Sequence, residues 1–170
     1  MRLPSLRQVA IALAVVFCGL QFFRPHKNVS DTAGGPKSFR AVMQVPPEVE
    51  HYLQSTCYDC HSDNTRYPWY TEIQPIAWMI AKHVRQGKQS LNFSEFGTMG
   101  ARAQLKRINY MVDSINENSM PVASFTLLHS KTEESAKQAT LQFLAKSIAA
   151  LEARILAESQ QEATLGQSHR

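Results

Sequence analysis

The positions of hydrophobic and polar residues along the chain predict an all-α protein. From about residue 46 onward, apolar residues recur three or four positions apart, as they do along one face of an α-helix. No segment alternates apolar and polar residues in the way that is typical of a half-buried strand. We therefore expect helices over residues 46–57, 75–86 and 98–117, and a last helix that begins near residue 132.

Residues that favour helix ends support these limits. Pro46-Pro47 followed by Glu48 suits a helix start, because proline is tolerated in the first turn and an acid stabilises the positive end of the helix dipole. Gly87 is expected to end the second helix, and Thr132 to cap the last one. The third helix carries one apolar stripe, made of Leu105, Ile108, Met111, Val112 and Ile115.

An apolar segment near the N-terminus predicts export. Residues 9–23 carry no charge, and Arg2, Arg7 and Arg24 flank them. As a helix, this segment would span about 22 Å at ~1.5 Å per residue, which is less than the ~30 Å core of a bilayer. We interpret residues 1–25 as a signal or membrane anchor, and both an uncleaved anchor and a cleaved signal remain open.

The rest of the chain is expected to form one domain. Residues 26–45 are polar and rich in turn-forming residues, which predicts a linker. Residues 46–158 would be the domain, and residues 159–170 a disordered polar tail. Four of the 18 basic residues lie in residues 1–27, so residues 28–170 hold 14 basic and 14 acidic residues. A neutral domain argues against nucleic-acid binding, which requires a clustered basic surface.

The segment Cys57-Tyr58-Asp59-Cys60-His61 carries the clearest chemistry. Two thiols three positions apart on one helical turn can each add to one of the two vinyl groups of a haem. The histidine that follows can then give a ring nitrogen to the iron. This is the attachment pattern of c-type haem.

Three other interpretations of the same segment are weaker. A zinc site would need two more ligands with clustered spacing, and residues 28–170 hold no further cysteine. A redox-active dithiol would be expected beside a βαβ pattern, which is absent from the sequence. A structural disulfide between Cys57 and Cys60 would leave His61 unexplained.

Further motifs extend the pattern beyond this segment. They are Asn64-Thr65-Arg66-Tyr67-Pro68-Trp69-Tyr70, then Pro75, Trp78, His83-Val84, Gly87-Lys88, Leu91-Asn92-Phe93-Ser94-Glu95-Phe96 and Met120-Pro121. With these motifs, residues 48–150 resemble the haem-binding domain family of short exported c-type cytochromes. The resemblance implies a cytochrome c-like helical domain around one covalent haem, and the end of the N-terminal segment resembles the membrane-anchor start of that family.

The second axial ligand of the iron is expected in a loop before the last helix. Met120 lies 59 residues after His61 and is followed by Pro121, which restricts the backbone and helps to present the thioether. Histidine with methionine is a usual axial pair in electron-transfer cytochromes. His83 is the alternative ligand, since it shares a helix face with apolar residues and is expected to point inward.

Two further residues are expected to contact the cofactor. Arg66 lies five residues after His61 and could pair with a haem propionate. Trp78 could form part of an apolar wall that excludes water from the iron. Surface solvation for Arg66 and ordinary core packing for Trp78 are the alternatives.

Together these patterns predict a periplasmic monohaem c-type cytochrome that is tethered to the cytoplasmic membrane. One-electron transfer with redox partner proteins of the respiratory chain is the expected function, and an electron carrier is favoured over an enzyme. The alternative is a haem-based sensor or peroxidase-like protein, in which the second axial position of the iron is open to small ligands.

Overall fold

The computed structural model describes residues 3–31, 33–122, 125 and 133–168 of the 170-residue chain. Over these residues the regular structure is entirely helical and contains no strand, so the all-α prediction is confirmed. The elements in chain order are α1 (Leu6–Leu20), α2 (Phe39–Met43), α3 (Pro47–Thr56), α4 (Tyr58–His61), η1 (Trp69–Glu72), α5 (Ile76–Ser90), η2 (Phe93–Thr98), α6 (Ala101–Asn116) and α8 (Glu134–Ser168).

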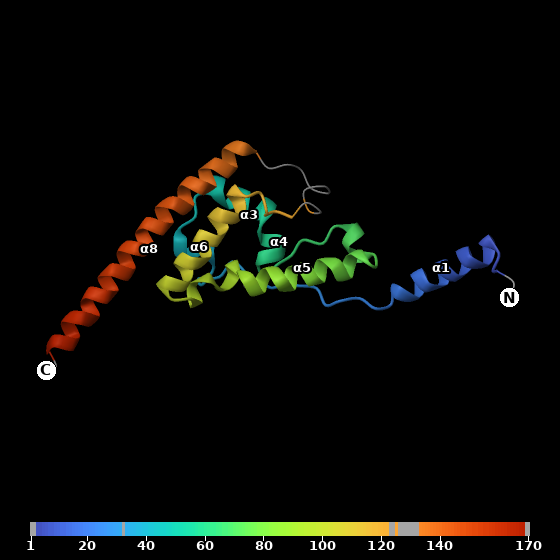
Figure 1. Cartoon of the computed structure of the whole chain (residues 1–170), viewed down its shortest axis with the longest axis horizontal. Helices are drawn as coiled ribbons and strands as arrows, with labels where there is room; N and C mark the ends of the chain where they lie inside the picture. The colour runs from blue at the N-terminus through green and yellow to red at the C-terminus, as the bar shows by residue number, and fades with distance from the viewer. Residues whose placement is uncertain (1–2, 32, 123–124, 126–132, 169–170) are drawn as a thin grey trace.

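Helix α1 lies at one end of the molecule, apart from the other helices (Figure 1). Ser5 and Gln8 form a capping box, in which each side chain accepts a hydrogen bond from the other residue's backbone N–H. None of the residues of α1 is buried, and Leu13 and Val15 are among its exposed apolar side chains. In the described part of the chain, no helix has both the length and the apolar character that crossing a membrane requires. The predicted apolar helix is present over Leu6–Leu20.

The segment over residues 26–45 is not the simple linker that its composition predicts. Ser38 caps the short helix α2, because its hydroxyl accepts a hydrogen bond from the backbone N–H of Ala41. Phe39, the first residue of α2, is fully buried and packs edge-on against Phe93 and Phe96 of η2. Phe39 thus fixes this segment to the core, and Met43 and Val45 pack against the same core.

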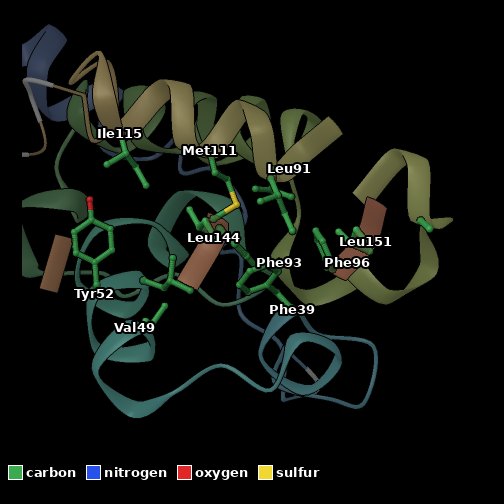
Figure 2. Packing of buried hydrophobic residues seen from close by; sticks show 13 residues of the cluster. Phe39, Val49, Tyr52, Leu91, Phe93, Phe96, Met111, Ile115, Leu144 and Leu151 are labelled. Atoms are coloured by element: carbon green, nitrogen blue, oxygen red, sulfur yellow. The ribbon is translucent and has the colours of Figure 1, made fainter. Parts of the chain in front are cut away.

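Helices α3, α6 and α8 surround the main hydrophobic core. Pro46 is the N-cap of α3, and Glu48 and Glu50 lie in its first turn, which confirms the predicted start. Helix α8 packs against both α3 and α6. Figure 2 shows Leu144 of α8 facing Met111 of α6 across this core. The described buried residues of this core cluster are Phe39, Val49, Tyr52, Leu53, Leu91, Phe93, Phe96, Ala101, Ile108, Met111, Ile115, Leu144 and Leu151.

Two predicted helix ends differ from the structure. Helix α5 continues past Gly87 to Ser90, so the glycine does not end it. Helix α8 runs through the predicted tail to Ser168, and Figure 1 shows its C-terminal part extending beyond the other helices. The predicted cap Thr132 lies outside the described residues.

Candidate functional site

The attachment motif lies where α3 passes into α4. Cys57 ends α3 and begins α4, and its carbonyl oxygen accepts hydrogen bonds from the backbone N–H groups of Cys60 at 3.2 Å and His61 at 3.0 Å. This single turn brings Cys57, Cys60 and His61 together, and all three are half-buried. The spacing in the sequence therefore produces the close grouping that was predicted from it.

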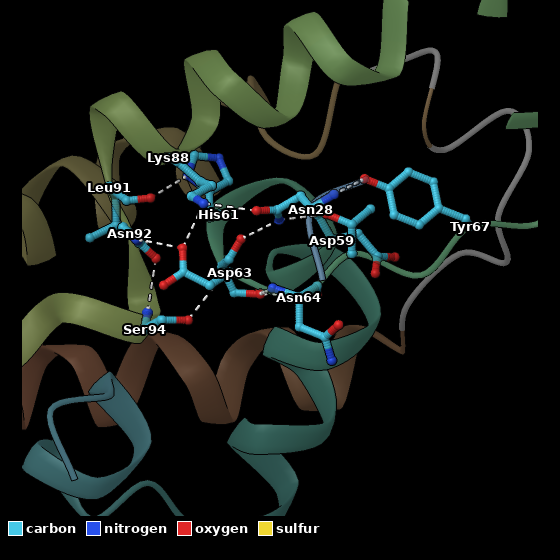
Figure 3. Close-up of polar contacts among 12 residues, drawn as sticks. Asn28, Asp59, His61, Asp63, Asn64, Tyr67, Lys88, Leu91, Asn92 and Ser94 are labelled. Carbon is cyan, nitrogen blue, oxygen red and sulfur yellow. Dashed lines mark hydrogen bonds and ion pairs between the residues drawn. The ribbon is translucent and has the colours of Figure 1, made fainter. Parts of the chain in front are cut away.

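The carbonyl oxygen of Leu91 orients the imidazole of His61. The two groups are 3.1 Å apart, as Figure 3 shows, and because a carbonyl only accepts, Nδ1 of His61 carries the hydrogen. The other ring nitrogen, Nε2, then keeps a free lone pair that can bind a metal. Burial lowers the pKa of His61 below its ordinary value, although backbone hydrogen bonds to Leu91 and Gly87 oppose that shift. The ring is therefore neutral at neutral pH, which metal binding requires.

Both motif cysteines are free, protonated thiols. Burial is the main cause that raises the pKa of Cys57 to about 11, against a smaller opposing effect of the Thr56 hydroxyl 3.2 Å from its sulfur. Burial also raises the pKa of Cys60 to about 11, and the carboxylate of Asp59 adds to this shift. Neither sulfur carries a charge at neutral pH.

The two residues between the cysteines hold the turn in place. The hydroxyl of Tyr58 donates a hydrogen bond of 2.8 Å to Glu50 of α3. Asp59 accepts three hydrogen bonds from Arg66, one from its backbone and two from its guanidinium, and the guanidinium also donates to the carbonyl oxygen of Gln54. Arg66 is thus already occupied within the turn, and its expected pairing with a propionate stays a prediction.

The largest apolar cavity beside the motif lies along α6, and we call it the α6 cavity. Its volume is about 410 Å³, within the range of small-molecule sites. Cys57 and His61 line it together with Met120, the predicted second axial ligand. Its full lining is Thr56, Cys57, His61, Ser90, Leu91, Phe93, Lys106, Arg107, Tyr110, Met111, Ser114, Ile115 and Met120.

A second, smaller cavity of about 50 Å³ lies beside α5, and we call it the α5 cavity. Cys60 lines this cavity together with His83, the alternative axial ligand, and Met79. The two cysteines therefore face two neighbouring cavities.

Trp78 lines neither of these two cavities, although it is expected to form part of the cofactor wall. Its side chain is 40% exposed, and its Nε1–H donates a hydrogen bond of 2.9 Å to the carbonyl oxygen of Phe23. The side chain of Gln74 donates to the same oxygen. Trp78 thus helps to hold the segment after α1 against α5.

Comparison with known protein families shows the family of this chain. Residues 15–146 match the family described as haem-binding domain, which is more than half of the chain. The chain belongs to the haem-binding domain family. No curated protein and no solved structure matched it. The match begins within α1, so the segment before α3 is part of the family's domain as well as of the packed fold.

The residues around the α6 cavity fit a haem. The cavity has a largely apolar lining from η2 and α6, which suits the face of a porphyrin. At its edge, His61 is neutral and has Nε2 free for iron, while Met120 offers a thioether on the same cavity. The free thiol of Cys57 lies on the same lining.

Gly87 sets how closely α5 of the haem-binding domain approaches the turn over residues 57–61, which we call the attachment turn. A Cβ atom built at Gly87 overlaps the carbonyl oxygen of Cys60 and lies 3.0 Å from the carbonyl carbon of the same residue. Only glycine permits this close packing of two backbones. The sequence shows the glycine, but it does not show that a second backbone lies against it.

Asn28 ties the N-terminal segment of the haem-binding domain to the loop that follows the motif (Figure 3). Its side chain donates to the carbonyl oxygen of Ser62 and to the hydroxyl of Thr65, and it accepts a hydrogen bond from Lys88. Its backbone N–H donates to the hydroxyl of Tyr67 at 2.8 Å. Lys88 also pairs with Asp63 at 2.6 Å, as Figure 3 shows. This network fixes the loop that follows His61.

Proposed function

We propose that this haem-binding protein is a c-type cytochrome that carries one covalent haem and transfers single electrons. Cys57 and Cys60 would form the two thioether bonds, and Nε2 of His61 would bind the iron. The observation that carries the proposal is that Cys57, His61 and Met120 line one apolar cavity, with His61 turned by Leu91 so that Nε2 is free.

The haem supplies an iron that changes between the ferric and ferrous states, and the protein supplies its surroundings. Leu91 holds the imidazole of His61 in one tautomer and orientation. Phe93 packs edge-on against Tyr58 and lies beside His61, so the attachment turn has little freedom to move. A site that holds its ligands in place suits electron transfer, because little rearrangement accompanies the change in charge.

Met120 is the second axial ligand in this proposal. It shares the α6 cavity with His61, whereas His83 lines the α5 cavity. The backbone N–H of Met120 donates to the carbonyl oxygen of Ser114, which fixes the residue to the end of α6. Its side chain is 42% exposed, so it has room to turn toward the cavity. A thioether ligand favours the ferrous iron relative to a second histidine.

A visible spectrum of the matured protein and of two variants tests the axial ligand and the function together. The wild-type protein should change reversibly between oxidised and reduced spectra, and the reduced form should bind carbon monoxide poorly. Met120→Ala should remove the weak far-red band that a thioether gives to ferric haem, lower the midpoint potential and admit carbon monoxide, while the covalent haem remains.

His83→Ala is the matched control for this test, since it removes the only competing ligand named from the sequence. It should leave the far-red band and the potential unchanged. If His83→Ala instead causes the ligand loss, the assignment of Met120 is wrong. If the reduced wild-type protein binds carbon monoxide readily, the second axial position is open, and the sensor or peroxidase-like function replaces electron transfer.

We also propose that the protein acts on the periplasmic side of the cytoplasmic membrane, where it exchanges electrons with respiratory-chain proteins as an electron carrier. The support is the exposed apolar surface of α1, which includes Leu13 and Val16, and the basic residues Arg7 and Arg24 near its two ends. Cell fractionation should recover the haem-stained protein with the membranes. If the N-terminal sequence of the mature protein begins after residue 18, and the stained protein is in the soluble periplasmic fraction, the signal is cleaved. That result would overturn the proposed attachment to the membrane.

A further inference from the structure

The α6 cavity carries a positive charge that none of the proposed roles so far uses. Among the described residues that line it, only Lys106 and Arg107 carry a charge. His61 is neutral, and the lining includes no aspartate or glutamate. The rest of the lining is apolar or uncharged. A ligand that fits this cavity should therefore combine an apolar body with at least one anionic group.

Neither cation has a partner in the described part of the chain. No ion pair or hydrogen bond joins the side chain of Lys106 or Arg107 to any described residue. Arg107 is half-buried and lines the cavity, and no carboxylate of the described residues pairs with it. Lys106 is exposed and lies beside it at the cavity margin.

Two other basic residues close to the motif are already paired. Arg66 is held by Asp59, and Lys88 is held by Asp63 and Asn28. Recruiting either of them to a ligand would break contacts that support the attachment turn. Lys106 and Arg107 can bind an anion without that cost.

We propose that Lys106 and Arg107 bind the propionate carboxylates of the haem. The proposal rests on the proposed function, in which the haem occupies the α6 cavity. Haem is an apolar ring with two carboxylates, which matches the apolar lining of this cavity and its two cations, neither of which has a partner among the described residues. Arg107 offers a planar group that can bind a carboxylate through two hydrogen bonds, and Lys106 adds a second positive charge. These residues replace Arg66 as the propionate partners.

Positive charge beside the haem favours the ferrous iron, because reduction lowers the positive charge of the site. Arg107→Gln and Lys106→Gln should therefore each lower the midpoint potential, and the double variant should lower it further. Arg107→Lys keeps the charge and should restore most of the wild-type potential. A potentiometric titration of the matured protein, followed by its visible spectrum, measures these shifts. Denaturing electrophoresis with haem staining should show the covalent haem unchanged in all of them.

Arg102→Gln is the matched control. Arg102 lies on the same helix and is exposed, but it does not line the cavity, so its removal tests the effect of one lost surface charge. Shifts in Arg107→Gln and Lys106→Gln that are no larger than the shift in Arg102→Gln would overturn the proposal. If Arg66→Gln shifts the midpoint potential more than Arg107→Gln and Lys106→Gln do, Arg66 is the propionate partner.

The same samples separate this proposal from the proposed function. If the wild-type protein shows no covalent haem, the cytochrome proposal itself fails. If it shows covalent haem but its potential does not respond to Lys106 and Arg107, only the propionate assignment fails. Lys106 is exposed, so Lys106→Gln is expected to fold even if Arg107→Gln does not.

Discussion

Replacing both Cys57 and Cys60 by alanine should abolish haem staining of the protein after denaturing electrophoresis. Both sulfurs lie on the turn that carries His61, and each lines a cavity beside that turn. Without thioether bonds, any haem is held only by its axial ligands and packing, and denaturation releases it. The expected loss is complete, because no other cysteine of the described chain lies near the motif.

The single variants should each keep one thioether bond and stain more weakly than the wild type. Cys18→Ala is the control, since Cys18 is exposed on α1 and lies outside both cavities. It should stain like the wild type. A double variant that stains normally would show that the haem is not attached through these sulfurs. A wild-type protein that never stains would favour a disulfide or dithiol instead.

The sequence predicts the helices that have a clear apolar stripe. The stripe that includes Ile108, Met111 and Ile115 places α6 within two or three residues of its observed limits, because burial of one face stabilises a helix wherever that face finds a core. The start of α3 is also predicted correctly, because the effect of proline in the first turn is local. Interactions between neighbours in the sequence are the ones that a sequence shows most directly.

Contacts between distant segments are not visible in the same way. Residues 26–45 have the composition of a linker, yet Asn28 joins residues that lie 34 to 60 positions later in the chain. Phe39 lies in a segment with no clear apolar period, and only the folded chain shows that Phe93 and Phe96 pack against it. No local pattern encodes such partners.

The choice of a proposed propionate partner shows the same limit. Arg66 is a reasonable propionate partner by its distance in sequence from His61, but its guanidinium is committed to Asp59. Lys106 and Arg107 lie far along the chain from His61 and still line its cavity. To choose a propionate partner among the basic residues, one must know which of them already form an ion pair with a carboxylate of the protein.

Gly87 has a structural role that differs from the one its sequence position predicts. Glycine often ends a helix, so the sequence predicts an end to α5 there. The helix instead continues to Ser90, and the missing side chain lets α5 pack against the backbone of Cys60. The glycine therefore lies against the turn that carries Cys60 and His61, although it carries no functional group.

Gly87→Ala should be one of the most damaging single-methyl changes in the protein. Alanine favours a helix over glycine by about 1 kcal/mol, so propensity alone would stabilise α5. The added Cβ, however, would overlap the carbonyl oxygen of Cys60, and neither the Cβ nor a backbone carbonyl can rotate away. Overpacking of this kind costs about 3 kcal/mol. We expect a net fall in the unfolding temperature of several degrees (~5–10 °C), together with a loss of haem-stained protein because the turn that carries Cys60 and His61 is displaced.

Gly19→Ala is the matched control for this change. Gly19 also lies within a helix, but a Cβ built there meets nothing within 4 Å. The variant should therefore show unchanged or slightly higher stability and normal haem staining. Thermal unfolding followed by circular dichroism, with haem staining of equal amounts of protein, compares the two. If Gly87→Ala unfolds at the wild-type temperature and stains fully, the backbones of α5 and the attachment turn are not in contact, and the site is more open than the structure shows. If it loses both properties while Gly19→Ala keeps them, the contact at Gly87 is part of what positions Cys60 and His61 for the haem.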